Sequence, residues 1–138
     1  MSNWNDFPDM DETSQARFLL DVAHTALPRL DHRPEHQAKI ADYLATAEAV
    51  LQGDVSRFAH LRRFLSDPQM TDDSDVYLYE FEGDAPAIAV LELAAYACGF
   101  VARIMAPAAG NPTLPDSIID ADPSIADYFE KQAATLGL

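Results

Sequence analysis

Hydrophobic residues recur every three to four positions along most of the chain, a spacing typical of amphipathic α-helices. The first such pattern begins after the sequence Asp-Glu-Thr-Ser at residues 11–14 and ends near Leu30. Thr13 or Ser14 is a suitable N-cap for this helix. Pro28 is expected to end or kink it, because proline cannot donate a backbone hydrogen bond. The apolar positions of this helix are Phe18, Leu19, Val22, Ala23, Leu27 and Leu30.

Two more helices are predicted between residues 34 and 66. Pro34 suits the first turn of a helix, and Gly53 suits the position after its last turn. Asp54 can then cap a third helix, which is expected to end at the sequence Ser-Asp-Pro of residues 66–68. The apolar residues are Ile40, Tyr43, Leu44, Ala47, Val50 and Leu51 in the second helix, and Val55, Phe58, Leu61, Phe64 and Leu65 in the third.

The stretch from Pro86 to Met105 predicts the longest helix, which is apolar on nearly all sides. A helix of this kind is packed by neighbours around most of its surface. Glu92, Tyr96 and Arg103 share one face and are expected to form a polar stripe that reaches the surface. The two charged residues would be costly in lipid. We therefore interpret this stretch as the central helix of a soluble bundle and expect no membrane association.

The last helix is expected to open at Asp122 and Pro123, after a chain-breaking sequence at residues 110–112, and to end at Gly137. Its inward-facing residues are predicted to be Ile125, Tyr128, Phe129 and Leu136. Taken together, the patterns predict an all-α fold, a single compact bundle of about five to six helices. The 138 residues suit one domain, with an irregular segment over residues 1–11.

The segment 76–82 has a different pattern. Its aromatic residues alternate with aliphatic and acidic ones in the sequence Val-Tyr-Leu-Tyr-Glu-Phe-Glu. Alternation with a period of two indicates a strand, but a single strand without a partner is unstable. A short extended segment, a short helix and an ordered loop are all compatible with this pattern.

Charge narrows the classes of partner. The chain has 23 acidic residues against 9 basic ones, a formal net charge of −14 at pH 7. Nucleic acids require clustered Lys and Arg, so neither they nor anionic membranes are expected partners. A basic protein partner is favoured by electrostatic steering. The negative charge concentrates between Asp67 and Glu92, where eight acids occur without a single Lys or Arg.

Motifs for catalysis or for cofactors do not stand out. Two of the four histidines, His32 and His36, have the spacing of helical metal ligands, but Pro34 between them would interrupt the helical turn that such ligands need. The acid pairs lack the glycine and glutamate of a calcium loop. Cys98, the single cysteine, lies in an apolar stretch and is expected to be a small buried hydrophobic residue. We therefore assign no catalytic residue, no metal site and no cofactor, and we expect no enzymatic activity.

The segment from Asp72 to Asp84 is the candidate binding site, because it combines aromatic with acidic residues. Aromatic side chains provide contact area at low entropic cost, and acids attract a basic partner. A solvated loop anchored by its aromatic residues is the alternative interpretation. The candidate partner-binding residues are Asp72, Asp73, Asp75, Tyr77, Tyr79, Glu80, Glu82 and Asp84.

The chain resembles an all-helical family of immunity proteins, number six in the usual numbering, from bacterial polymorphic toxin systems. The resemblance lies in residues 14–30, in the helix around Tyr96 and in Leu114-Pro115 with Ile118, Asp122 and Ile125. It implies a cytoplasmic protein that binds and neutralises a cognate toxin domain, delivered by a contact-dependent or type VI secretion system, by occluding the toxin's active site. An adaptor or secretion chaperone for an effector protein, and an enzyme without a recognisable motif, are alternatives. The oligomeric state is left open.

Overall fold

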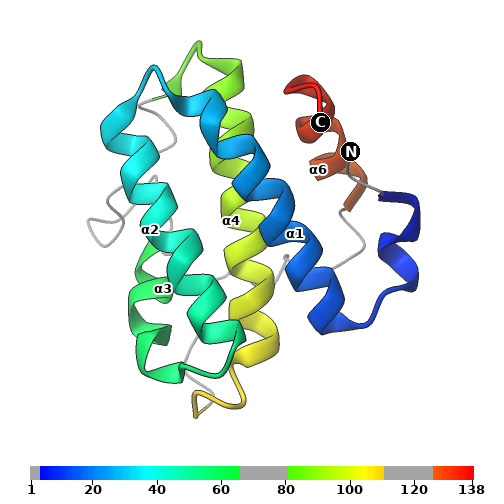
Figure 1. Ribbon diagram of the computed structural model, residues 1–138, viewed down its shortest axis with the longest axis vertical. Helices are drawn as coiled ribbons and strands as arrows, with labels where there is room; N and C mark the ends of the chain where they lie inside the picture. Colours follow the sequence, from blue (N-terminus) through cyan, green and yellow to red (C-terminus); the bar gives the residue numbers. More distant parts are fainter. Residues whose placement is uncertain (1–3, 66–80, 111–125) are drawn as a thin grey trace.

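The computed structural model describes residues 4–65, 81–110 and 126–138. Within these ranges the chain is all-helical, as predicted, and forms a compact bundle (Figure 1). The α-helices are α1 (Glu12–Ala26), α2 (Pro34–Leu51), α3 (Phe58–Leu65), α4 (Ala85–Met105) and α6 (Ala126–Thr135). The 3-10 helices are η1 (Trp4–Asp9), η2 (Leu27–Leu30) and η3 (Val55–Arg57).

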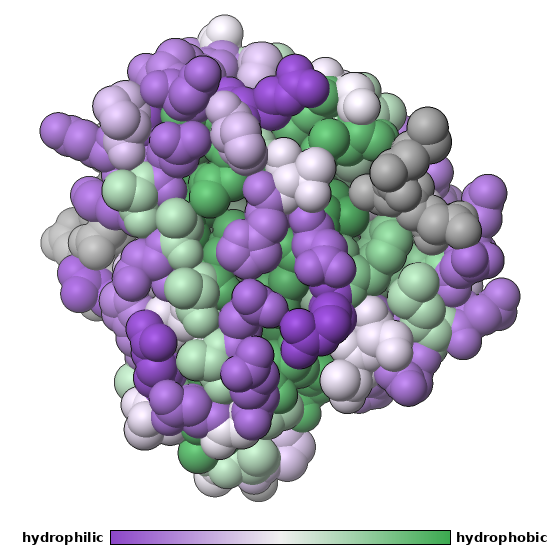
Figure 2. Space-filling model, in the orientation of Figure 1, coloured by the Kyte–Doolittle hydropathy of each residue, from purple (hydrophilic) through white to green (hydrophobic). Residues whose placement is uncertain are grey.

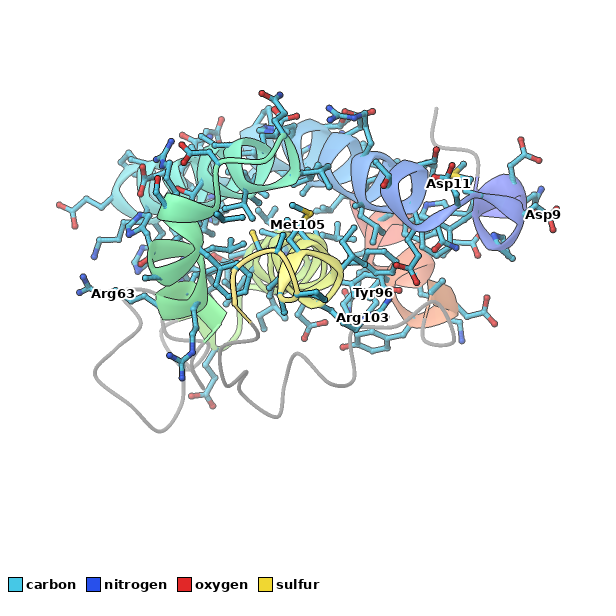
Figure 3. The ribbon with its side chains drawn as sticks, turned by 90° about the horizontal axis from the view of Figure 1, so that it is seen from below. Asp9, Asp11, Arg63, Tyr96, Arg103 and Met105 are labelled. Carbon is cyan, nitrogen blue, oxygen red and sulfur yellow. The ribbon has the colours of Figure 1, made fainter. Side chains whose placement is uncertain are left out.

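Helix α4 is the centre of the bundle, and α1, α2, α3 and α6 all pack against it. Figure 3 looks nearly along α4 and shows the other helices grouped around it. Small residues such as Ala94, Ala97 and Gly99 are buried on α4 and allow close approach by its neighbours. Among the described helices, α4 alone has the length and hydropathy of a membrane span, and 72% of that window is buried within the fold. This burial is typical of the core helix of a soluble protein.

Proline and glycine set several helix ends where they were predicted. Helix α1 ends at Ala26, and Pro28 lies in the 3-10 turn that follows. Helix α2 begins at Pro34. Gly53, two residues after the end of α2, has a φ of 111°, a backbone conformation that side chains disfavour. Gly137 plays the same part after α6, with a φ of 77°.

The cap of α1 differs from the prediction of Thr13 or Ser14. Asp11 is the N-cap, and its Oδ1 accepts a hydrogen bond of 2.7 Å from the backbone N–H of Ser14. That hydrogen bond lowers the pKa of Asp11. The carboxylate of Asp11 can satisfy a free N–H of the first turn, so the helix starts earlier than a Thr13 cap would allow.

The N-terminal segment is ordered rather than irregular from Trp4 onward. Trp4 and Phe7 are buried, since residues three apart lie on the same side of a 3-10 helix. Their rings pack with Phe18 of α1, and Phe7 also meets Phe100 of α4. Gln15 Nε2 donates a hydrogen bond of 2.9 Å to the Phe7 carbonyl, which fastens η1 to α1.

The expected polar stripe of α4 is largely covered by α6. Tyr96 is only 3% exposed because the Phe129 ring stacks on it, with centroids 3.9 Å apart. Tyr128, which was predicted to face inward, is instead 49% exposed. Neighbouring residues on a helix point about 100° apart, so only one of these two aromatic residues can face α4. Phe129 takes that position, and Leu136 is buried as predicted.

Candidate functional site

Most of the predicted partner-binding residues lie outside the described ranges. These residues are Asp72, Asp73, Asp75, Tyr77, Tyr79 and Glu80. Of the segment 76–82, only residues 81 and 82 are described, and both belong to a turn before α4. Glu82 is exposed and Asp84 is partly buried. The structure thus describes one end of the candidate site.

Asp84 joins the starts of two helices. Its Oδ1 accepts a hydrogen bond of 3.2 Å from the Ala87 N–H, which caps α4. Its Oδ2 accepts one of 2.8 Å from Arg33 Nε and lies 2.7 Å from His32 Nε2. The Arg33 hydrogen bond, followed by that of His32, lowers the pKa of Asp84 to about 2. Asp84 is therefore an ionised structural residue, and only 17% of its side chain is exposed.

Phe81 is the second point of attachment. Its side chain is fully buried, although it comes from a run of acidic and aromatic residues. The Arg33 guanidinium lies over the Phe81 ring, 4.8 Å from its centroid, and the His36 ring meets it edge-on at 4.9 Å. We call Phe81 and Asp84, with their partners His32, Arg33 and His36, the Phe81 anchor. It fixes the end of the candidate segment to the start of α2.

The contacts of the Phe81 anchor were not predicted from the sequence. Two signals for it were present, since His32, Arg33 and His36 cluster around Pro34, and Phe81 is the last aromatic residue before the cap of α4. Only the fold brings these positions, about fifty residues apart, into contact. His32 and His36 have the spacing of metal ligands, but His32 contacts Asp84 and His36 contacts Phe81. The described residues contain no group of three His, Cys, Asp or Glu side chains suited to a metal ion.

The other histidines also link elements. His60 Nε2 of α3 lies 2.6 Å from Asp42 Oδ2 of α2, and its ring stacks on Tyr43 with centroids 4.9 Å apart. His24 Nε2 of α1 lies 3.8 Å from Glu48 Oε2 of α2. The same Glu48 accepts a hydrogen bond of 3.1 Å from Arg17. These contacts tie α1, α2 and α3 together at the surface.

Cys98 is fully buried in α4, as predicted. Its Sγ lies 3.8 Å from the Tyr43 carbonyl oxygen. Burial raises the pKa of the Cys98 thiol far above neutral pH, so the thiol stays protonated. A thiol in this state is a poor nucleophile, and Cys98 acts as a packing residue.

The outer surface is hydrophilic over much of the face in Figure 2, with apolar residues visible between polar ridges. Exposed acidic side chains occur on η1, α1, α2 and α6 and in the turns between helices, whereas α3 and α4 expose none. Four of them lie between residues 6 and 12, where no Lys or Arg occurs. Figure 3 shows Asp9 and Asp11 at one end of the molecule and Arg63 of α3 at the other. The exposed acids are Asp6, Asp9, Asp11, Glu12, Asp21, Asp31, Glu35, Asp42, Asp54, Glu82, Asp127 and Glu130.

Comparison with known proteins identifies no relative of this chain. No protein-family model, no curated protein and no solved structure matches the chain. The functional argument therefore depends on the residues themselves.

Proposed function

We propose that this protein is an immunity protein, which binds a cognate secreted toxin domain in the cytoplasm and neutralises it by occluding its active site. The observation that carries the proposal is the large surplus of negative charge. The chain has a net charge of −14, and its described surface exposes acids on η1, α1, α2 and α6 and in the turns between helices. Such a surface favours rapid, specific association with a basic protein.

Several reactive side chains of the described residues have contacts that stabilise the fold. Here His32 and His60 lie against carboxylates that join two elements, and Cys98 is buried and protonated. Asp84, whose pKa is lowered to about 2, is occupied by a helix cap and an arginine. These groups support the fold.

The resemblance to immunity proteins gives the proposal its particular form. Proteins of that kind work by tight contact and need no chemistry of their own. A toxin that acts on nucleic acid must carry basic residues at its active site to hold phosphates. An acidic protein can cover such a site and compete with the nucleic acid for it. We therefore propose a basic, nucleic-acid-directed toxin domain as the partner.

The test is a growth assay. The C-terminal domain of the neighbouring open reading frame is expressed in a susceptible bacterium, with and without this protein. Rescue of growth, together with co-purification of the two proteins, is the expected result. A toxic domain that this protein does not rescue would rule out that pairing. A harmless domain that still co-purifies would favour an adaptor or secretion chaperone instead.

A further inference from the structure

Helix α6 is held to the rest of the bundle by few buried side chains. Of its ten residues only Ala133 is buried, and Leu136 is buried in the turn that follows. Helix α1, by comparison, buries seven of its 15 residues. Among the described elements, α6 packs mainly against α4, on the opposite side from α2 and α3 (Figure 1), whereas α1 also packs against α2, η1 and η2. Little buried apolar surface therefore stabilises the docking of α6.

The docked position of α6 depends instead on polar and aromatic contacts with one turn of α4. Glu92 is the only acid of α4, and its Oε2 accepts hydrogen bonds of 2.6 Å from the Tyr128 hydroxyl and of 3.0 Å from Gln132 Nε2. One turn further along α4, the Tyr96 ring stacks on Phe129. The Glu92 latch consists of Glu92 and Tyr96 of α4 with Tyr128, Phe129 and Gln132 of α6. Because Tyr128 is 49% exposed, water competes for its hydrogen bond, and the net stabilisation is modest.

We propose that the Glu92 latch holds α6 as a strap, which opens as a unit while the rest of the bundle stays folded. An element with few buried apolar contacts needs less free energy to open than the whole domain needs to unfold. The helices α1, α2 and α3 keep their own packing on α4 when α6 leaves. Opening uncovers Tyr96, which is only 3% exposed in the closed form. The open form thus presents an aromatic face, with Glu92 beside it, that the closed form hides. This inference does not depend on the proposed function.

The first test is native-state hydrogen exchange of the full chain, followed by NMR under conditions where reclosing is faster than exchange. The amides of residues 130–135 in α6 are expected to exchange about tenfold faster, relative to their intrinsic rates, than the slowest amides of α4. Low concentrations of urea should accelerate the α4 amides strongly and the α6 amides weakly, because opening of α6 exposes little surface. Equal protection with equal urea dependence would mean that α6 opens only by global unfolding, which would overturn the proposal.

Two variants separate the opening of α6 from global unfolding. Tyr128→Phe removes one hydrogen bond of the closed form, so exchange in α6 should be about three- to tenfold faster. Exchange in α4 should accelerate by the same factor, because global unfolding starts from the same closed form. Asp84→Ala removes the cap at the start of α4, which the closed form and the form with α6 open share. This variant should therefore accelerate exchange in α4 by about fivefold and leave exchange in α6 unchanged.

The control is Glu130→Gln, at an exposed position of α6 outside the Glu92 latch. It should change the exchange rates of both helices by less than about twofold. Equal acceleration of α4 and α6 by Asp84→Ala would overturn the separate opening of α6. An effect of Tyr128→Phe on α6 no larger than that of Glu130→Gln would overturn the role of the latch.

Discussion

At the scale of single residues, Asp84 has a structural role that its place in an acidic segment does not indicate. It caps α4 and pairs with Arg33, which also covers the ring of Phe81. The same carboxylate therefore connects the start of α4 to the start of α2. Glu82, two residues earlier, has the same charge and is exposed. The two acids provide a matched comparison of a structural carboxylate with a surface one.

Replacing Asp84 with alanine should destabilise the protein by about 1–2 kcal/mol, because a lost N-cap alone has roughly this effect. The partly exposed ion pairs add little to this figure. Urea unfolding followed by circular dichroism measures the change. The control, Glu82→Ala, should change the free energy of unfolding by less than about 0.5 kcal/mol. Equal losses in the two variants would contradict the structural role of Asp84.

The lowered pKa of Asp84 also predicts a pH dependence. Its pKa falls from 3.8 to about 2 on folding, so the ionised carboxylate favours the folded state. This contribution is fully present above pH 3.8 and is lost as the pH falls through about 2. The difference in stability between the wild type and Asp84→Asn should thus be constant at neutral pH and shrink in this acidic window. A difference in stability that grows on acidification would contradict a lowered pKa of Asp84 in the folded protein.

At the scale of elements, η1 extends the hydrophobic core beyond the first α-helix. Phe7 is fully buried and contacts both Phe18 of α1 and Phe100 of α4. Gln15 holds the carbonyl of the same residue. The short 3-10 helix is thus tied to two α-helices by rings and to one by a hydrogen bond. It is a part of the domain rather than a tail.

Phe7→Ala should therefore lower the free energy of unfolding by about 3–5 kcal/mol, the usual cost of removing a buried phenyl ring. Pro8→Ala, at the exposed neighbouring position, should have a small effect. Thermal or urea unfolding measures both. If Phe7→Ala were as stable as Pro8→Ala, the N-terminal segment would have to lie outside the cooperative core.

Helix boundaries could be predicted where local chemistry sets them. Pro34, Gly53 and Gly137 act through their own backbones, and the uniform apolar character of α4 indicated its burial. The orientation of Tyr128 and Phe129 could not be predicted, since both are aromatic and only the packing of α6 on α4 selects between them. The Phe81 anchor likewise depends on contacts between positions distant in the chain. Most of the candidate site lies outside the described ranges, so its residues stay a prediction.

At the scale of the whole molecule, charge is the dominant property. The net charge of −14 produces a long-range field that accelerates encounter with a basic protein at low salt. The charge is uneven, because the acids of residues 6–12 and the arginines of α3 lie at opposite ends of the bundle (Figure 3). A basic partner should therefore approach in a preferred orientation.

Reversal of Asp72, Asp73 and Asp75 to lysine should slow association with the toxin domain by about tenfold or more at low salt, because steering commonly changes association rates by this much. It should also weaken the dependence of the rate on salt while folding stays intact. The control reverses Asp9, Asp21 and Glu35, which changes the net charge equally from exposed described positions. Stopped-flow kinetics compares the two. Identical slowing would mean that only total charge matters and that residues 72–75 have no special place in the interface.

The burial of Cys98 has a practical consequence for such measurements. The chain contains a single thiol, and it lies in the helix that every other described α-helix contacts. A thiol-specific reagent can reach it only when the bundle opens. Under conditions where labelling is faster than reclosing, the rate of modification equals the rate of opening. The unmodified protein thus carries its own reporter of unfolding, by which the kinetic stability of each variant can be followed at native pH and without denaturant.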